Sequence, residues 1–182
     1  MTMTFTPGAP QPIHITPAGD RAVTVCIGEN IDAETNRRVY SIIKHMDNMS
    51  VPGILDLVPA YTSILILYDP MQISITDLYE EIHQANANSS VEDQPMPDVV
   101  EIPVLYGGKR GPDMNFVAEH AKLSEDQIIT MHSENEYLVY MMGFTPGFPY
   151  LGGMSNEIST PRLLTARTQI PAGSVGIAEL QY

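Results

Sequence analysis

The chain has 182 residues and a mass of 20.0 kDa, enough for one ordinary domain or two small ones. Nine lysines and arginines against 22 aspartates and glutamates give a net charge of −13 and a pI near 4.5. Such a chain repels phosphate backbones and anionic lipid headgroups, which argues against roles on nucleic acid or membrane surfaces. Hydrophobic residues, at 43%, allow a sizeable core, and a single cysteine excludes an internal disulfide framework.

The sequence predicts a soluble, cytoplasmic protein. No apolar stretch approaches the roughly 18 residues of a membrane span, and the N-terminus lacks the basic and apolar regions of a secretory signal. The charge is uneven, because residues 1–137 carry 7 basic and 20 acidic side chains whereas residues 138–182 carry only two of each. That neutral segment is typical either of a loop-rich β region or of a surface that presents its two arginines to an anion.

In chain order, the first half predicts a small α+β unit. We expect strands at 13–17, 22–27, 54–58 and 63–68, from their β-branched and apolar runs between turn residues. Asp32 is placed to cap a helix with one apolar stripe, and Ser74-x-x-Asp77 resembles a capping box ahead of a second helix. The polar, proline-bearing segment 86–98 is typical of a linker.

The second half predicts a strand, two short helices, another strand and then a turn-dense region. We expect these elements at 99–105, near Asp113, from Glu125 and at 136–142. Ser124-x-x-Gln127 resembles a capping box at the start of the second of these helices. The expected organisation is therefore an N-terminal domain over 1–85, a linker over 86–98 and a second domain over 99–182.

Standard catalytic motifs are absent from the sequence. It contains neither a P-loop nor a strand-coupled GxGxxG, and its five histidines lack the spacing of a zinc site, so we expect no metal. Cys26 lies in an apolar strand, as a buried structural cysteine would. Ser174 in Ala-Gly-Ser-Val-Gly half-matches a hydrolase nucleophile elbow, and a turn serine is the alternative.

Two features after residue 142 favour a binding site. Glycines and prolines in Gly-Phe-Thr-Pro-Gly-Phe-Pro-Tyr-Leu-Gly-Gly constrain a loop that carries Phe144, Phe148 and Tyr150. These aromatic side chains either line a pocket, dock a partner or pack against one another. Arg162 and Arg167, each close to threonine, suit recognition of carboxylate or phosphate, although surface arginines are often only solvated. His132 and Asp113 are the nearest candidates for proton transfer.

Three strings in this order, GFTPGFPYLGGM, TPRLLTART and IPAGSVGIA, resemble the family of the 5-oxoprolinase B-type subunit. That family is also labelled allophanate hydrolase subunit 1, or carboxyltransferase subdomain C/D, and includes an inhibitor of a sporulation histidine kinase. Upstream strings agree, among them VPAYTS, IPVLYGG and GPD, so the resemblance covers nearly the whole chain.

The resemblance implies an α+β protein with a small ferredoxin-like N-terminal sandwich followed by a cyclophilin-like β-barrel. The family's PAGSVGIA string usually continues into further strands, so the resemblance also implies an incomplete, truncated barrel here. The implied function is that of a non-autonomous subunit of an ATP-dependent amidohydrolase, which acts with a homologous barrel subunit and a third subunit to cleave 5-oxoproline to glutamate. The alternatives are an allophanate hydrolase subunit and a regulatory protein that inhibits a histidine kinase.

The candidate site residues follow from the motifs and the resemblance together. The catalytic candidates are His132, Arg162, Arg167 and Ser174, and the substrate-binding candidates are Tyr106, Phe144, Phe148 and Tyr150. The implied cofactor is ATP, and the implied substrate is a small lactam or amide.

Overall fold

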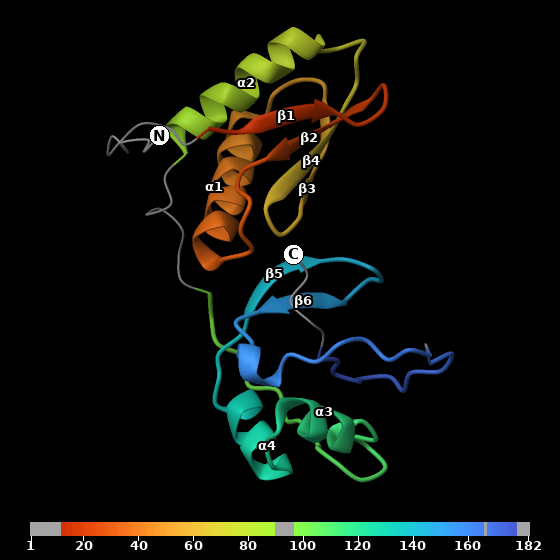
Figure 1. Ribbon diagram of the computed structural model, residues 1–182. Coiled ribbons are helices and arrows are strands. Elements are labelled where there is room, and N and C mark those ends of the chain that lie inside the picture. Colours follow the sequence, from red (N-terminus) through yellow and green to blue (C-terminus); the bar gives the residue numbers. More distant parts are fainter. Residues whose placement is uncertain (1–11, 90–96, 166, 178–182) are drawn as a thin grey trace, which may run out of the picture. The chain divides into compact units, whose positions relative to one another are not determined.

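The structure, a computed structural model, describes residues 12–89, 97–165 and 167–177 and contains both helices and strands, which confirms the α+β class (Figure 1). Its described residues group into two compact units. The first contains the described residues up to Pro97 together with Val139–Gly152, and the second contains Asp98–Leu138 with the described residues from Gly153 onward. The domain boundaries at the expected linker remain a prediction, since residues 90–96 lie outside the described part.

The first unit contains a four-stranded antiparallel sheet with two helices on one face (Figure 1). The spatial order is β1-β2-β4-β3, from β1 (His14–Pro17), β2 (Ala22–Cys26), β3 (Ile54–Pro59) and β4 (Ser63–Tyr68). The helices are α1 (Ala33–Met49) and α2 (Ile75–Asn88). The run β2-α1-β3-β4-α2 forms the first five elements of a ferredoxin-like β-α-β-β-α-β motif. Strand β1 takes the sixth place beside β2, although it comes first in the chain.

Both helices begin at the caps that the sequence predicts. The Asp32 side chain accepts a hydrogen bond from the amide of Thr35 at 2.7 Å, and the Ser74 hydroxyl accepts one from the amide of Asp77 at 3.1 Å. Each cap satisfies an amide that has no partner inside its own helix. These local bonds set the start of each helix and therefore the direction in which its apolar stripe faces.

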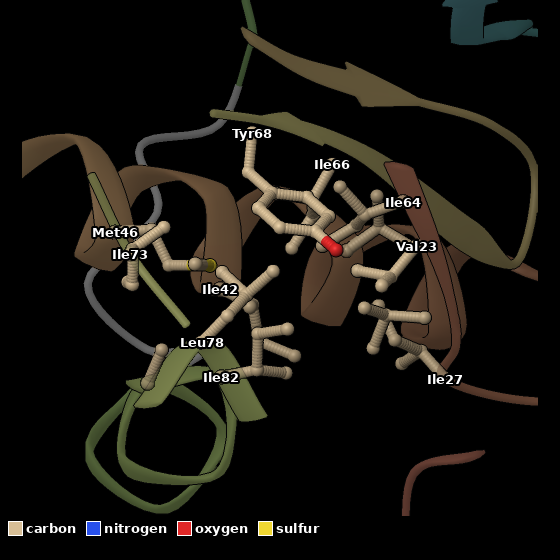
Figure 2. Packing of buried hydrophobic residues seen from close by; sticks show 13 residues of the cluster. Val23, Ile27, Ile42, Met46, Ile64, Ile66, Tyr68, Ile73, Leu78 and Ile82 are labelled. Carbon is tan, nitrogen blue, oxygen red and sulfur yellow. The ribbon is translucent and has the colours of Figure 1, made fainter. Parts of the chain in front are cut away.

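The core of the first unit lies between the sheet and the two helices (Figure 2). Alternate residues of β2 and β4 face the helices, and Val23, Ile64 and Ile66 are fully buried. Along β4, buried residues alternate with half-buried ones, because the two helices pack against one face of the sheet. The helices contribute Val39, Ile42, Met46, Leu78, Ile82 and Ala85.

The expectation that Cys26 is buried is wrong. Cys26 is the last residue of β2 and is exposed, whereas its neighbour Val25 is fully buried. Successive residues of a strand point to opposite faces of the sheet, so the alternation that buries Val25 turns Cys26 away from the helices.

The second unit has a much smaller core. It contains α3 (Met114–Ala121), α4 (Glu125–Ser133) and a 3₁₀ turn at Asn156–Ile158. A capping box starts α4 as expected, with Ser124 and Gln127 bonding each other's backbone amides. The buried apolar residues here are Val117, Ile128 and Ile158. Among the helices of both units, as far as the structure describes them, none has the length and apolar character needed to span a membrane.

The described residues form no closed barrel. The only strands after residue 98 in the described part are β5 (Leu138–Met142) and β6 (Pro149–Gly152), which pair with each other and group largely with the first unit. The strand expected at 99–105 is wrong: this segment lacks regular structure and leaves Val99 and Ile102 each 71% exposed. A strand needs a hydrogen-bonding partner, and a barrel needs such partners around its whole circumference.

Candidate functional site

His132 lies in the last turn of α4 between two tyrosine side chains. Its Nδ1 atom is 2.6 Å from the Tyr106 hydroxyl, and the two ring centroids are 5.7 Å apart. On the other side, the Tyr137 ring lies 5.4 Å from the imidazole, and its hydroxyl donates to the backbone carbonyl of His132 at 3.0 Å. The structure therefore brings together two predicted site residues, Tyr106 and His132, and adds Tyr137.

Burial favours the neutral form of all three of these side chains. It lowers the pKa of His132 and raises the pKa values of Tyr106 and Tyr137, the latter with a further contribution from Tyr106. We assign the Tyr106 hydroxyl as donor to Nδ1, which leaves the imidazole proton on Nε2. An imidazole in this state is able to accept a proton at one nitrogen and release one at the other.

A tight glycine loop carries Tyr106 at one end and Asp113 at the other. The carbonyl of Gly107 accepts hydrogen bonds from the amides of Arg110 at 3.2 Å and Gly111 at 2.8 Å. Gly107 has a φ of 70°, and a Cβ on Gly111 would lie 2.5 Å from the nitrogen of Gly107. The loop therefore requires glycine at both positions.

Asp113 precedes α3 at the N-cap position, yet its side chain caps nothing. Instead, its two carboxylate oxygens accept hydrogen bonds from Nη1 and Nη2 of Arg167. The hydrogen bonds from Arg167 lower the pKa of Asp113, and the same bonds raise the pKa of Arg167. The bidentate partner of Arg167 in this structure is thus a carboxylate of the same chain.

The other two catalytic candidates, Arg162 and Ser174, are exposed. Arg162 has no hydrogen bond or ion pair with any residue in the described ranges, so its guanidinium is available to a ligand. The Ser174 hydroxyl donates to the carbonyl of Pro171 at 2.8 Å, the geometry of a turn serine. Within the described part of the chain, no hydrogen bond joins Ser174 to His132.

In the first unit, five aromatic rings form a continuous row. Centroid distances are 5.7 Å from Phe144 to Phe148, 5.3 Å from Phe148 to Tyr150 and 5.9 Å from Tyr150 to Tyr61. Tyr61 continues the row to Tyr140 at 5.7 Å. Such spacings are typical of favourable aromatic pairs. Of the predicted substrate-binding aromatics, Phe148 therefore contacts both Phe144 and Tyr150.

The backbone of this aromatic loop, residues 143–148, is closed by its own hydrogen bonds. The amide of Gly143 donates to the carbonyl of Phe148, and the amide of Phe148 donates to the carbonyl of Thr145, both at 3.1 Å. Phe144 has a left-handed φ of 57° and is 86% exposed, an unusual conformation for a residue with a bulky side chain. A shallow cavity of about 320 Å³ is lined by Met142, Gly143, Phe144, Thr145, Pro146 and Gly147.

The predicted residues thus fall into two groups, one in each unit. The first unit holds the aromatic loop, and the second holds Tyr106, His132, Arg162, Arg167 and Ser174. Sequence reasoning missed Tyr61, Tyr137 and Tyr140. The ring contact between Tyr61 and Tyr140 joins residues distant in sequence, whereas Tyr137 lies only five residues after His132. In the described ranges, no three metal-ligating side chains come together.

Comparison with known proteins assigns the chain to a family. Residues 13–182 match the family described as "Carboxyltransferase domain, subdomain C and D". The chain is 39% identical over 173 residues to the B-type subunit of 5-oxoprolinase from Bacillus subtilis (strain 168), covering 90% of this chain and 72% of that protein. It is 36% identical over 160 residues to the corresponding 5-oxoprolinase subunit of Escherichia coli O157:H7, covering 87% of this chain and 72% of the relative.

A solved structure agrees with the sequence comparisons. The crystal structure of TTHA0988 superposes with a TM-score of 0.74 at 33% identity, covering 87% of this chain and 31% of the TTHA0988 chain. The chain therefore belongs to the carboxyltransferase-domain family, subdomain C and D, and the resemblance seen in the sequence motifs is confirmed.

Proposed function

We propose that this chain is the B-type subunit of a 5-oxoprolinase and that, together with partner subunits, it opens 5-oxoproline to glutamate at the expense of ATP. The observation that carries the proposal is the 39% identity, over 90% of this chain, to the B-type subunit of the Bacillus subtilis 5-oxoprolinase. We further propose a homologous barrel subunit and a third subunit as its partners in the cytoplasm.

The candidate residues of each unit suit a different chemical group of the reaction. 5-Oxoproline is a small, nearly flat lactam ring that carries one carboxylate. The segment from Leu138 to Asn156 contains no charged side chain, so its aromatic loop suits the neutral ring. In the second unit, Arg162 suits an anionic group such as a carboxylate or a phosphate, because its guanidinium has no partner in the described part of the chain, whereas Arg167 already binds Asp113.

The reaction requires activation of a stable amide. Transfer of the γ-phosphoryl group of ATP to the lactam oxygen would make the carbonyl carbon electrophilic, and water would then add to that carbon. Breaking of the ring C–N bond requires a proton on the leaving nitrogen and would leave an acyl phosphate on the side chain. A second water would hydrolyse this acyl phosphate, so that glutamate, phosphate and ADP are the products. The neutral His132–Tyr106 pair is our candidate for this proton transfer. Because the sequence contains no P-loop, we assign the ATP site to the assembled complex.

The test is co-expression of the chain with the two partner subunits and measurement of ATP-dependent glutamate release from 5-oxoproline. We expect release from the complex and none when this chain is omitted. Arg162→Ala is expected to lower kcat/KM for 5-oxoproline about 10- to 100-fold, the effect of losing a charged hydrogen bond to an anion, and Gln169→Ala is the control for an exposed polar residue nearby in sequence. A correctly assembled and folded complex that releases no glutamate would show that the proposal is wrong.

A further inference from the structure

Strands β5 and β6 form a hairpin that carries the aromatic loop, and helix α1 holds this hairpin. The backbone carbonyl of Tyr140, in the middle of β5, accepts two hydrogen bonds from side chains about a hundred residues earlier in the chain. One comes from Nδ2 of Asn36 and the other from the hydroxyl of Tyr40, each at 3.1 Å. Asn36 and Tyr40 are four residues apart on α1 and so lie on the same face of that helix.

Asn36 is a polar residue in a place where polar residues are costly. It is only 3% exposed, and burying an amide is unfavourable unless its hydrogen bonds are satisfied. The apolar contacts of α1 with the core of the first unit are made by Val39, Ile42 and Met46, so the packing of that core does not depend on the Asn36 amide. The contact that its amide makes is with the β5 carbonyl of the hairpin.

Two further contacts, both near the aromatic loop, restrain the hairpin. The Tyr61 ring, between β3 and β4, packs against Tyr140 of β5 and Tyr150 of β6. Gly152 of β6 leaves room for the Tyr140 ring, because a Cβ at this position would lie 1.6 Å from Cε2 of that ring. Both strands are therefore fixed to the first unit, and the loop of residues 143–148 lies between the two fixed strands.

We propose that Asn36 and Tyr40 are positioning residues: they hold the Tyr140 carbonyl and thereby set the place of Phe144 and Phe148 for binding the lactam ring. Helix α1 of the first unit accordingly takes part in substrate binding, because it holds the Tyr140 carbonyl of the strand that leads into the aromatic loop. This role goes beyond supporting the core of that unit. The ligand named here rests on the proposed function. The mechanical coupling of helix α1 to the aromatic loop rests on the hydrogen bonds and ring contacts alone.

The first experiment measures amide hydrogen exchange in the 182-residue chain without partners. Tyr40→Phe removes one hydroxyl and keeps the ring, so the fold is preserved. Tyr79→Phe is the matched control, since Tyr79 packs against the core of the same unit from α2 with no hydroxyl hydrogen bond among the described residues. We expect Tyr40→Phe to speed exchange of the Gly143 and Phe148 amides about five-fold, the effect of losing one hydrogen bond.

In the same experiment, amides in the β2–β4 ladder should keep their rates in Tyr40→Phe, which separates a local change from general destabilisation. Asn36→Ala should speed the same loop amides further and serves as a second variant. If Tyr40→Phe leaves the amides of Gly143 and Phe148 at the rates of Tyr79→Phe, or speeds ladder and loop amides equally, the positioning role is refuted.

The second experiment measures kinetics in the assembled complex. We expect Tyr40→Phe to raise KM for 5-oxoproline several-fold while KM for ATP stays constant. A merely structural role would lower the amount of active protein and hence the apparent kcat, without changing either KM. If Tyr40→Phe speeds exchange of the loop amides but the assembled complex does not act on 5-oxoproline, the coupling is supported and the proposed function is overturned. An unchanged KM for 5-oxoproline in an active complex would overturn the link between coupling and binding.

Discussion

Gly152→Ala should destabilise the first unit by forcing the Tyr140 ring out of its place. An ideal Cβ on Gly152 would lie 1.6, 2.5 and 2.7 Å from Cε2, Cδ2 and Cζ of that ring. Ordinary carbon contacts begin near 3.4 Å, so the ring has to move by about 2 Å. Tyr140 is 5% exposed and its carbonyl is held by Asn36 and Tyr40, which leaves the ring little freedom.

The magnitude follows from two losses. Overpacking a well-packed site costs about 1–3 kcal/mol. A ring displaced by about 2 Å also loses its pairing with Tyr61, which is worth about 0.5–1.5 kcal/mol. We therefore expect the free energy of unfolding of the first unit to fall by about 2–4 kcal/mol. The assay is urea unfolding followed by tyrosine fluorescence, with hydrogen exchange to assign the transition to this unit.

Two controls make the prediction sharp. A Cβ on Gly176 meets no atom within 4 Å, so Gly176→Ala should change the free energy of unfolding by less than about 0.5 kcal/mol. In a Tyr140→Ala background the new methyl group has space, so Gly152→Ala should then cost little. If Gly152→Ala is neutral in the parent, or costs the same in both backgrounds, the steric reasoning is wrong.

Three further outcomes test other parts of the structure. An NMR titration should give His132 a pKa below 6.5, because burial favours the neutral imidazole. The free energy of unfolding should therefore fall as pH falls from about 7 through the folded pKa, and in His132→Gln the urea midpoint should depend less on pH in this range. A double-mutant cycle of Asp113→Ala and Arg167→Ala should show a coupling that shrinks between about 0.05 and 0.5 M salt, because the pair is solvent-exposed. Ile128→Ala should destabilise the second unit by about 2–5 kcal/mol while exchange in the β2–β4 ladder stays constant.

The elements that the sequence predicted correctly depend on short-range interactions. The caps at Asp32, Ser74 and Ser124 each involve an amide three residues further along, so the residues that form them are visible in a short string. The apolar stripe of α1 likewise reflects which side of that helix is buried. The family could also be recognised from the sequence, because three motif strings in a fixed order identify it without any knowledge of contacts.

The elements that the sequence predicted wrongly depend on long-range pairing. Residues 99–105 have the composition of a strand, yet strand formation requires a ladder partner, and no partner pairs with them among the described residues. Strand β6 was not predicted, because its residues lie in a turn-dense string and form a strand only by pairing with β5. Composition alone carries no information about which strands meet.

For the candidate site, the sequence determined the chemical types and the tertiary structure decided their partners. The string from Gly143 to Gly153 already specified a constrained aromatic loop, and Arg162 and Arg167 already stood out in a neutral segment.

Only the fold decided that Arg167 meets Asp113, which lies 54 residues away, and that Tyr106 meets His132. Only the fold, too, brought the Tyr140 carbonyl to Asn36 and Tyr40 of α1. The physical reason is that a residue's chemistry is local, whereas a hydrogen bond between distant residues exists only once packing has brought them within reach.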